Sequence, residues 1–306
     1  MDMKIEWGFE QGIFWQIMRP KTASKIDAVV VGYHGYGDHS DFGMQWHAQE
    51  VLKMNQPSED RNPSIAFVLF DQPGAGRSDG LWGYVPDWFE HVEKCRKFLD
   101  FVKEQKFPGI PIYGFGFSCG GGILVSMEAM HSMKHQSPLF AGLVLLAPML
   151  AIEPSMKPPP FVQLLLRFAV KLCPTWPVVM SAYSGELSYR DPSWHMKSRL
   201  MNKLQYCGYP RLATAQSFLQ AVEWMPSVFE NISTPYILLH GTADFVTCIK
   251  GSRKFHVSNN SKIKKFLVLE GYRHHILGPG QEEEHNEKPY KEIRAWLKEM
   301  VASGLH

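Results

Sequence analysis

The residues best suited to chemistry lie at positions 116–120, where the sequence Gly-Phe-Ser-Cys-Gly places Ser118 between two glycines. This pentapeptide follows a short apolar run over 110–115 and precedes an apolar, helix-like stretch over 121–130. A serine on such a sharp strand-to-helix turn forms a nucleophile elbow, and the glycines prevent a collision between strand and helix. At a helix N-terminus, unpaired N–H groups favour a developing negative charge. The pattern therefore predicts that Ser118 attacks a carbonyl carbon.

Glycine-rich turns also bind phosphate in two common sequence patterns, and this chain fits neither. A dinucleotide-binding fingerprint that starts at Gly114 requires a glycine where the sequence has Cys119. A P-loop requires Gly-Lys followed by Ser or Thr, which occurs nowhere in the sequence. The pentapeptide by itself still leaves an ordinary tight turn as an equal alternative, so the rest of the chain decides.

A serine nucleophile needs a histidine to accept its proton and an acid to orient that histidine. The apolar run over 236–239 leads into a segment that ends at Asp244, and the run over 266–269 leads into one that ends with His274 and His275. The chain order serine, acid, histidine is the order that a nucleophile elbow on an α/β sheet requires. All these residues follow the ends of apparent parallel strands, where such sheets gather their ligands.

A loop near the N-terminus supplies groups for the negative charge that such an attack creates. The apolar run over 28–31 ends in the turn Gly-Tyr-His-Gly-Tyr-Gly at 32–37, which exposes backbone N–H groups. We expect the backbone N–H groups of Tyr36 and Cys119 to form an oxyanion hole. Loss of one such donor costs about 10²–10³ in rate, so the hole matters as much as the base.

The elements that must position these residues alternate between strand and helix. Continuous apolar runs are typical of parallel strands covered on both faces; they occupy 28–31, 65–70, 112–115, 143–147, 236–239 and 266–269. Two aromatic-rich strands that form a hairpin occupy 4–9 and 13–18, and the clearest helices occupy 88–102, 123–135 and 290–301. This order predicts an α/β fold with a mostly parallel, doubly wound sheet.

The alternation stops between residues 150 and 230. This stretch contains no convincing strand, carries Lys-Pro-Pro-Pro at 157–160, and includes several helical segments. We therefore expect a helical cap at 150–230 that is inserted into an α/β core formed by 1–149 and 231–306.

The cap holds the best indication of a ligand. Over 160–173 the polar residues recur every four positions on one side, at Gln163, Arg167 and Lys171. The remaining circumference is apolar, which is more than a helix packed from one side needs. This apolar surplus predicts an acyl-chain tunnel or a membrane-facing lid, with full burial or a dimer contact as the alternative. The residues that form the surplus are Phe161, Leu164, Leu165 and Phe168.

Composition excludes several classes of protein. The chain has 306 residues, of which 45% are hydrophobic and 20% charged, and its net charge of +2 with scattered basic residues gives no reason to expect a nucleic-acid partner. Its five cysteines are widely spaced without Cys-x-x-Cys, which favours a reducing compartment over disulfides or zinc. Neither a signal peptide nor a membrane-spanning run is present. We expect a soluble, cytoplasmic protein, with peripheral membrane contact through the cap left open.

The remaining polar clusters are typical of turns and solvated helix ends. Asp71 and Asp79 lie in a Gly/Pro-rich turn without further ligand-spaced carboxylates, and His131 and His135 lie at the polar end of a helix. We therefore expect no metal ion. Asp244 has an alternative role as the N-cap of a helix that starts a few residues later, although its place in the chain order favours catalysis.

Taken together, these motifs resemble the α/β-hydrolase superfamily, and within it the monoacylglycerol lipase and lysophospholipase branch, which includes caffeoyl-shikimate-esterase-like members. The resemblance covers nearly the whole chain and rests on the segments 34–40, 71–80, 116–120, 146–149, 240–244 and 270–274. It implies the α/β-hydrolase fold, a cap over the site, an ester substrate and no cofactor.

The resemblance also implies the roles of individual residues. It gives catalytic roles to Ser118, Asp244 and His274, because the family spacing Gly-x-x-His selects His274 over the histidine that follows it. The branch usually has His before and Met after the serine, where this chain has Phe117 and Cys119. Backbone donation to the oxyanion survives both changes, whereas the shape of the pocket changes.

The sequence thus predicts a serine esterase that acts on a lipid monoester through an acyl-enzyme. Three alternatives stay open: an aromatic or short-chain carboxylesterase, an acyltransferase that uses an alcohol as acceptor, and a receptor-like homologue that binds a ligand without turnover. The expected partner is a lipid or another small ester, and the oligomeric state is left open.

Overall fold

One mixed sheet forms the centre of the computed structural model, which describes residues 3–21, 25–55, 62–156, 159–177, 188–278 and 280–304. Its strand order is β1-β2-β4-β3-β5-β6-β7-β8. The strands are β1 (Met3–Glu10), β2 (Ile13–Pro20), β3 (Ala28–Tyr33), β4 (Ile65–Phe70), β5 (Ile112–Phe117), β6 (Gly142–Leu146), β7 (Tyr236–Gly241) and β8 (Lys264–Leu269). From β4 to β8 all neighbours pair in parallel, while β1 and β2 pair antiparallel. The predicted mostly parallel sheet is confirmed.

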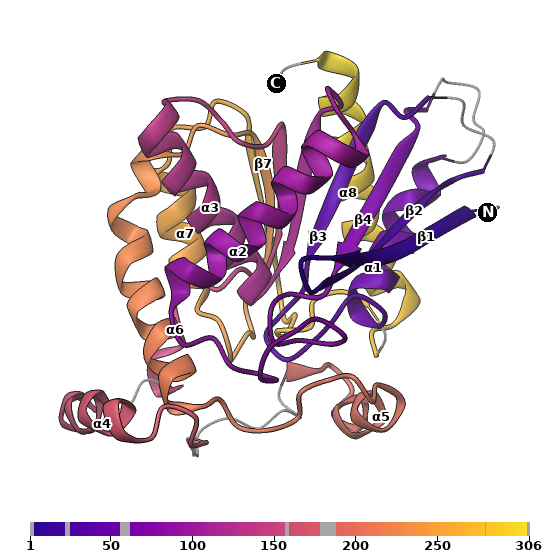
Figure 1. The fold of residues 1–306 in the computed structure, drawn as a ribbon. Helices are drawn as coiled ribbons and strands as arrows, with labels where there is room; N and C mark the ends of the chain where they lie inside the picture. The colour runs from indigo at the N-terminus through magenta and orange to yellow at the C-terminus, as the bar shows by residue number, and fades with distance from the viewer. Residues whose placement is uncertain are drawn as a thin grey trace.

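Helices cover both faces of the sheet (Figure 1). One face carries α2 (Trp88–Phe101), α3 (Cys119–His135) and α7 (Ile249–Ser258), and the other carries α1 (Gly43–Leu52) and α8 (Glu283–Ser303). Within β3, Val29 and Val31 face the first layer and Val30 faces the second, and all three are fully buried. Because both faces are covered, the strand has no polar alternation.

The N-terminal hairpin has the geometry that its sequence predicts. β1 and β2 are joined by Gln11 and Gly12, which both have positive φ, at 48° and 78°. Two such residues in succession are typical of the type I′ turn, whose twist matches that of the flanking strands. The hairpin predicted at 4–9 and 13–18 is therefore confirmed.

The last helix begins earlier than the sequence predicts. A start at Tyr290 was expected from the amphipathic pattern, but α8 begins at Glu283 and includes Pro289. Glu283 and Glu284 lie in its first turn, where carboxylates interact favourably with the helix dipole. These two exposed glutamates therefore mark the start of the helix.

Between β6 and β7 the described residues form helices and connecting segments, without a strand of the sheet. These are η3 (Pro154–Met156), α4 (Pro160–Leu172), α5 (Ser193–Met201), α6 (Leu212–Trp224), η5 (Met225–Ser227) and η6 (Phe229–Asn231). α4 and α5 lie beyond one end of the sheet, at the bottom of Figure 1. Two short helical segments elsewhere are η1 (Lys53–Asn55) and η2 (Val102–Lys106). The domain boundaries at 150 and 230 stay a prediction.

None of the described helices is long and apolar enough to cross a membrane.

Candidate active site

Ser118 lies on a turn that only glycine neighbours permit. β5 ends at Phe117 and α3 begins at Cys119, so Ser118 alone makes the turn, with φ 54° and ψ −118°. A Cβ atom on Gly120 would lie 2.0 Å from the carbonyl oxygen of Tyr33. No side chain fits there, because the turn presses the start of α3 against the end of β3.

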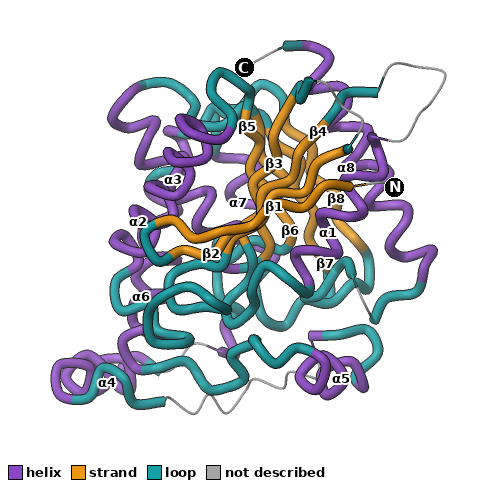
Figure 2. Tube along the Cα trace, turned by 45° about the vertical axis from the view of Figure 1, so that its right-hand side comes forward, coloured by secondary structure: helices purple, strands orange, loops and turns teal. Residues whose placement is uncertain are grey.

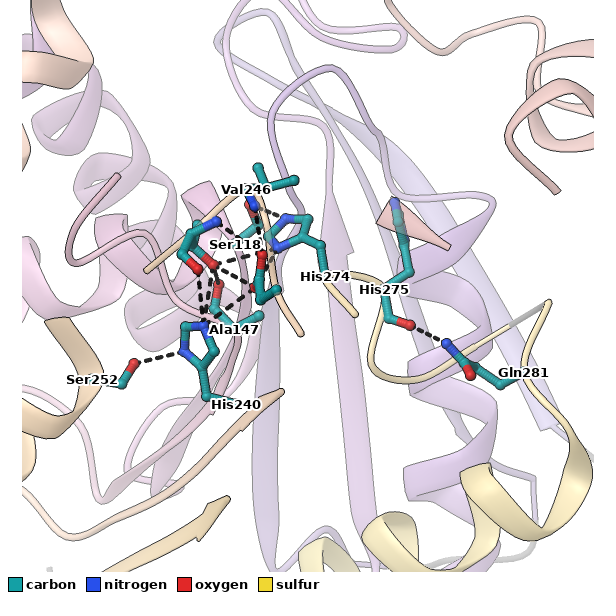
Figure 3. Close-up of polar contacts among 10 residues, drawn as sticks. Ser118, Ala147, His240, Val246, Ser252, His274, His275 and Gln281 are labelled. Atoms are coloured by element: carbon teal, nitrogen blue, oxygen red, sulfur yellow. Dashed lines mark hydrogen bonds and ion pairs between the residues drawn. The ribbon is translucent and has the colours of Figure 1, made fainter. Parts of the chain in front are cut away.

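The structure brings Ser118, His274 and Asp244 together in one hydrogen-bonded chain. Figure 3 shows Ser118, His274 and His240 close to one another. His274 Nδ1 lies 2.8 Å from Asp244 Oδ2, and His274 Nε2 lies 2.9 Å from Ser118 Oγ. Because an ionised carboxylate only accepts, Nδ1 carries the proton and Nε2 accepts from the serine hydroxyl. All three side chains are buried. This is the arrangement in which a histidine removes the serine proton.

Asp244 is held by more donors than the triad requires. Its Oδ1 accepts from the backbone N–H groups of Val246 at 2.8 Å and Thr247 at 3.0 Å, and its Oδ2 accepts from Thr247 Oγ1 at 2.8 Å. Burial alone would raise the pKa of Asp244, but the electrostatic interaction with His274 and hydrogen bonds from the His240 and His274 rings hold it well below the ordinary value. Asp244 is therefore ionised. It is not the N-cap of α7, which is Cys248.

The second imidazole beside Asp244 belongs to His240, for which the sequence suggested no role. His240 Nε2 lies 3.3 Å from Asp244 Oδ2 and 3.2 Å from the carbonyl oxygen of Thr247, while Nδ1 lies 2.8 Å from Ser252 Oγ. Since both oxygens near Nε2 are acceptors, this nitrogen carries a proton and donates. The signal in the sequence is a histidine at the end of β7, four residues before the acid.

The loop that contains Tyr36 lies directly against the elbow. A Cβ atom on Gly35 would lie 3.5 Å from Ser118 Cβ. His34 fixes this loop, because its Nε2 accepts from Gln72 N–H at 3.0 Å and its Nδ1 donates to the Gly35 carbonyl oxygen at 2.8 Å. Burial lowers the pKa of His34, so the ring stays neutral and keeps this tautomer.

The side chain of Tyr36 is held away from the reaction. Its hydroxyl donates to the carbonyl oxygen of Gly83 at 2.8 Å. Both Tyr36 and Cys119 line the cavity at Ser118. Their backbone N–H groups are the expected oxyanion donors.

Ser118 opens into a cavity of about 680 Å³ whose lining is largely apolar and aromatic, with polar side chains such as Asp38, Arg199 and Gln205 among it. Aliphatic and aromatic side chains from the core and the helical insertion form one part, namely Met149, Ile152, Leu166, Phe218, Leu219 and Val246. Rings form another, namely Phe42, His47, Phe117, Tyr189, Trp194, His195 and His275. Within it, His275 stacks on Tyr189 with ring centres 4.0 Å apart and lies 5.3 Å from Phe117. The cavity is large enough for an extended ester.

The four apolar residues predicted to contact substrate from the cap do not line this cavity. More than half of each side chain is exposed on α4; they are Phe161, Leu164, Leu165 and Phe168. The residue of α4 that does line the cavity is Leu166. This placement does not fit an acyl-chain tunnel formed by these four residues, and it rules out full burial in a single chain. A membrane-facing surface and a dimer contact both stay predictions.

Comparison with known proteins identifies the family. The family described as serine aminopeptidase, S33, matches residues 24–281. The chain belongs to this family. This match and the eight-stranded, mostly parallel sheet confirm the predicted α/β-hydrolase fold and superfamily.

Several relatives of this chain are named as ester hydrolases. Caffeoylshikimate esterase of Arabidopsis thaliana is 26% identical over 90% of this chain and 79% of its own, and monoglyceride lipase of Homo sapiens is 24% identical over 96% and 89%. A crystal structure of monoacylglycerol lipase from Paleococcus ferrophilus superposes with a TM-score of 0.72 at 23% identity, covering 99% of both chains. These relatives confirm the predicted enzyme class, a carboxylic-ester hydrolase.

Proposed function

We propose that this protein hydrolyses the ester of a monoacylated lipid, with Ser118 as nucleophile, His274 as base and acid, and Asp244 as the group that orients His274. The observation that carries the proposal is the hydrogen-bonded chain from Asp244 through His274 to Ser118, at the wall of a largely apolar cavity. The human and yeast relatives named monoglyceride lipase support the lipid substrate.

The reaction follows from this geometry. Ser118 Oγ attacks the ester carbonyl while its proton passes to His274 Nε2, and Asp244 stabilises the imidazolium that forms. The backbone N–H groups of Tyr36 and Cys119 stabilise the oxyanion. The C–O bond to the alcohol then breaks, and the alcohol leaves with the proton from His274. A water molecule, deprotonated by His274, attacks the acyl-enzyme and releases the fatty acid.

The outer face of the cap supports delivery of the substrate from a membrane. α4 and α5 both contribute to the cavity lining, through Leu166 and through Trp194 and His195. The same two helices expose large apolar side chains, among them Phe161, Phe168, Leu172, Met196 and Leu200. Insertion of this surface among lipids would bring the cavity close to an ester in the bilayer. We place this surface in a cap of residues 150–230.

A second candidate substrate is an aromatic ester. The rings of Phe42, Phe117, Tyr189 and His275 in the cavity wall favour a flat aromatic group, since rings pack best against one another at such distances. The Arabidopsis relative is named for an ester of this kind. The family description, by contrast, names a peptidase, so an amide substrate belongs in the test.

The test compares fatty-acid release from a long-chain monoacylglycerol with turnover of a hydroxycinnamoyl ester, a short aryl ester and an aminoacyl arylamide. We expect fast turnover of the monoacylglycerol, and a loss of at least about 10⁴ in kcat/KM in Ser118→Ala. An alkyl fluorophosphonate should label the wild type and not this variant.

The outcomes separate the parts of the proposal. If only the aromatic or short esters react, the lipid substrate is wrong and the triad stands. If the arylamide reacts fastest, the peptidase description is the better one. If no substrate reacts faster with the wild type than with Ser118→Ala, hydrolysis through Ser118 is wrong and a receptor-like role replaces it.

A further inference from the structure

Strand β1 forms one edge of the sheet, with β2 as its neighbour on one side and no described strand on the other. It is eight residues long, and Figure 2 shows it in front of the other strands. Edge strands present unpaired backbone N–H and C=O groups, and proteins usually keep such edges short, twisted or charged. A long edge strand with an apolar face is therefore a place where another chain can pair.

The unpaired backbone groups of β1 belong to the residues that carry its apolar side chains. Phe14 of β2 directs its backbone away from β1, because its N–H donates to Ser78 Oγ and its carbonyl oxygen accepts from Asp71 N–H, both at 2.9 Å. Its partner Phe9 therefore directs its own backbone outward, as does every second residue of β1. The exposed fractions of these side chains are 50% for Ile5, 67% for Trp7 and 57% for Phe9.

We propose that two copies of this chain associate by antiparallel pairing of their β1 strands about a two-fold axis at Trp7. In this register Trp7 faces Trp7 of the second copy, Ile5 faces Phe9, and Lys4 faces Glu10. Apolar pairs thus occupy the centre, and an ion pair closes the contact at each end. A two-fold contact requires a surface that is complementary to itself, and β1 in this register meets that requirement. The partner that pairs with this edge strand is therefore a second copy of the chain.

Neighbouring registers are less favourable. A two-fold axis at Glu6 would bring the Glu6 carboxylates of the two copies face to face, and an axis at Gly8 would place Glu6 of one copy opposite Glu10 of the other. Both registers are unfavourable because like charges directly opposite one another destabilise a strand pair. Glu6 already pairs with Lys106 at 2.9 Å. Lys4 and Glu10 form no ion pair with any residue that the structure describes, so both are available to a second copy.

The first test is the mass in solution, measured by sedimentation velocity from about 1 to 200 μM, since a contact of one strand is smaller than a standard interface and favours micromolar affinity. We expect the mass of two chains at the upper concentrations. Trp7→Lys sets two lysines against each other at the axis and should weaken the dimer at least tenfold. Val257→Lys, a change at an apolar residue that is 79% exposed on α7, should leave the dimer intact.

Two results would overturn the proposal: a single-chain mass at every concentration, or a dimer that Trp7→Lys weakens no more than Val257→Lys does. Turnover of a short soluble ester should be unchanged in both variants if they fold, because neither residue lines the cavity. This control separates failure of the dimer from failure of the proposed hydrolysis.

A second test addresses the register. Lys4→Glu and Glu10→Lys each place like charges opposite one another, and each should weaken the dimer several-fold. The double variant restores opposite charges with their positions exchanged, so it should recover close to wild-type affinity. A double variant that is as weak as the sum of the two changes would show that Lys4 and Glu10 do not meet, and would overturn this register.

Discussion

His240 extends the hydrogen-bonded chain of Ser118, His274 and Asp244 by one residue. It is completely buried, its Nε2 lies 3.3 Å from Asp244 Oδ2, and Ser252 Oγ lies 2.8 Å from its Nδ1. A packing role alone would be filled better by an apolar side chain, because a buried imidazole must find partners for both nitrogens. We infer that His240 fixes the position of Asp244 and spreads part of its negative charge.

His240→Leu tests this role. Loss of the hydrogen bond from His240 Nε2 leaves the Asp244 carboxylate more basic, and a more basic Asp244 stabilises protonated His274 better. The acid limb of the kcat/KM profile therefore moves to higher pH. Activity at the plateau should fall about 10- to 100-fold, as expected for one hydrogen bond to a charged group. His240→Gln keeps a donor near the same place and should recover most of the loss. If the profile of His240→Leu falls in height without moving along the pH axis, His240 has only a structural role.

At the scale of elements, the elbow was predictable and the orientation of the cap helix was not. Around Ser118 the requirement is steric and local: a turn this tight leaves no space for a side chain at Gly120, so the glycine marks the turn. On α4 the apolar pattern predicts an apolar surface, but it does not indicate which other part of the molecule, or which partner, contacts that surface. Leu166 reaches the cavity while Leu164 and Leu165 are exposed, a difference set by packing against α6.

The exposed face of α4 gives a prediction about lipid surfaces. Phe168→Glu replaces an exposed aromatic with a charge, so it should lower binding to phosphatidylcholine vesicles about 10-fold or more, the scale expected for burial of one large apolar side chain. Vesicle flotation measures this binding. Turnover of a short soluble ester should stay unchanged, because Phe168 lies outside the cavity lining.

A matched control is Met133→Glu, which changes an exposed apolar residue near the other end of α3, away from Ser118. This variant should bind vesicles as the wild type does. Equal loss in both variants would mean that added charge, and not the face of α4, lowers binding.

At the scale of the molecule, the sequence predicted the sheet well because the parallel strands β3, β4, β5, β6 and β7 are short runs of buried, mostly apolar residues. β4 and α2 begin where the pattern places them, at Ile65 and Trp88. Contacts between distant segments were not predictable in the same way. The approach of His240 to Ser252, or of His34 to Gln72, depends on how strands and helices pack, and no local pattern records it.

Buried histidines make the stability of the whole fold dependent on pH. Burial lowers the pKa of His47 and of His91 to about 3, and both side chains are buried in the folded protein. In the unfolded chain the pKa of each is near 6.5, so below this pH the unfolded state binds protons that the folded state excludes. Stability is therefore complete above about pH 7 and falls as the pH decreases from 6.5 toward 3.

The size of this effect can be measured by urea unfolding between pH 8 and pH 4.5. Each histidine contributes up to about 1.4 kcal/mol per pH unit, so the two together remove up to about 5 kcal/mol by pH 4.5, a large part of the stability of a typical domain. His91→Gln cannot take up a proton on unfolding. Because burial also lowers the pKa of His275 to about 3, this variant should flatten the curve by about a third in this window. Its curve should run parallel to that of the wild type above pH 7.5. A wild-type curve that is flat from pH 7 to pH 5 would show that these histidines are protonated in the folded protein, because only then does unfolding take up no protons.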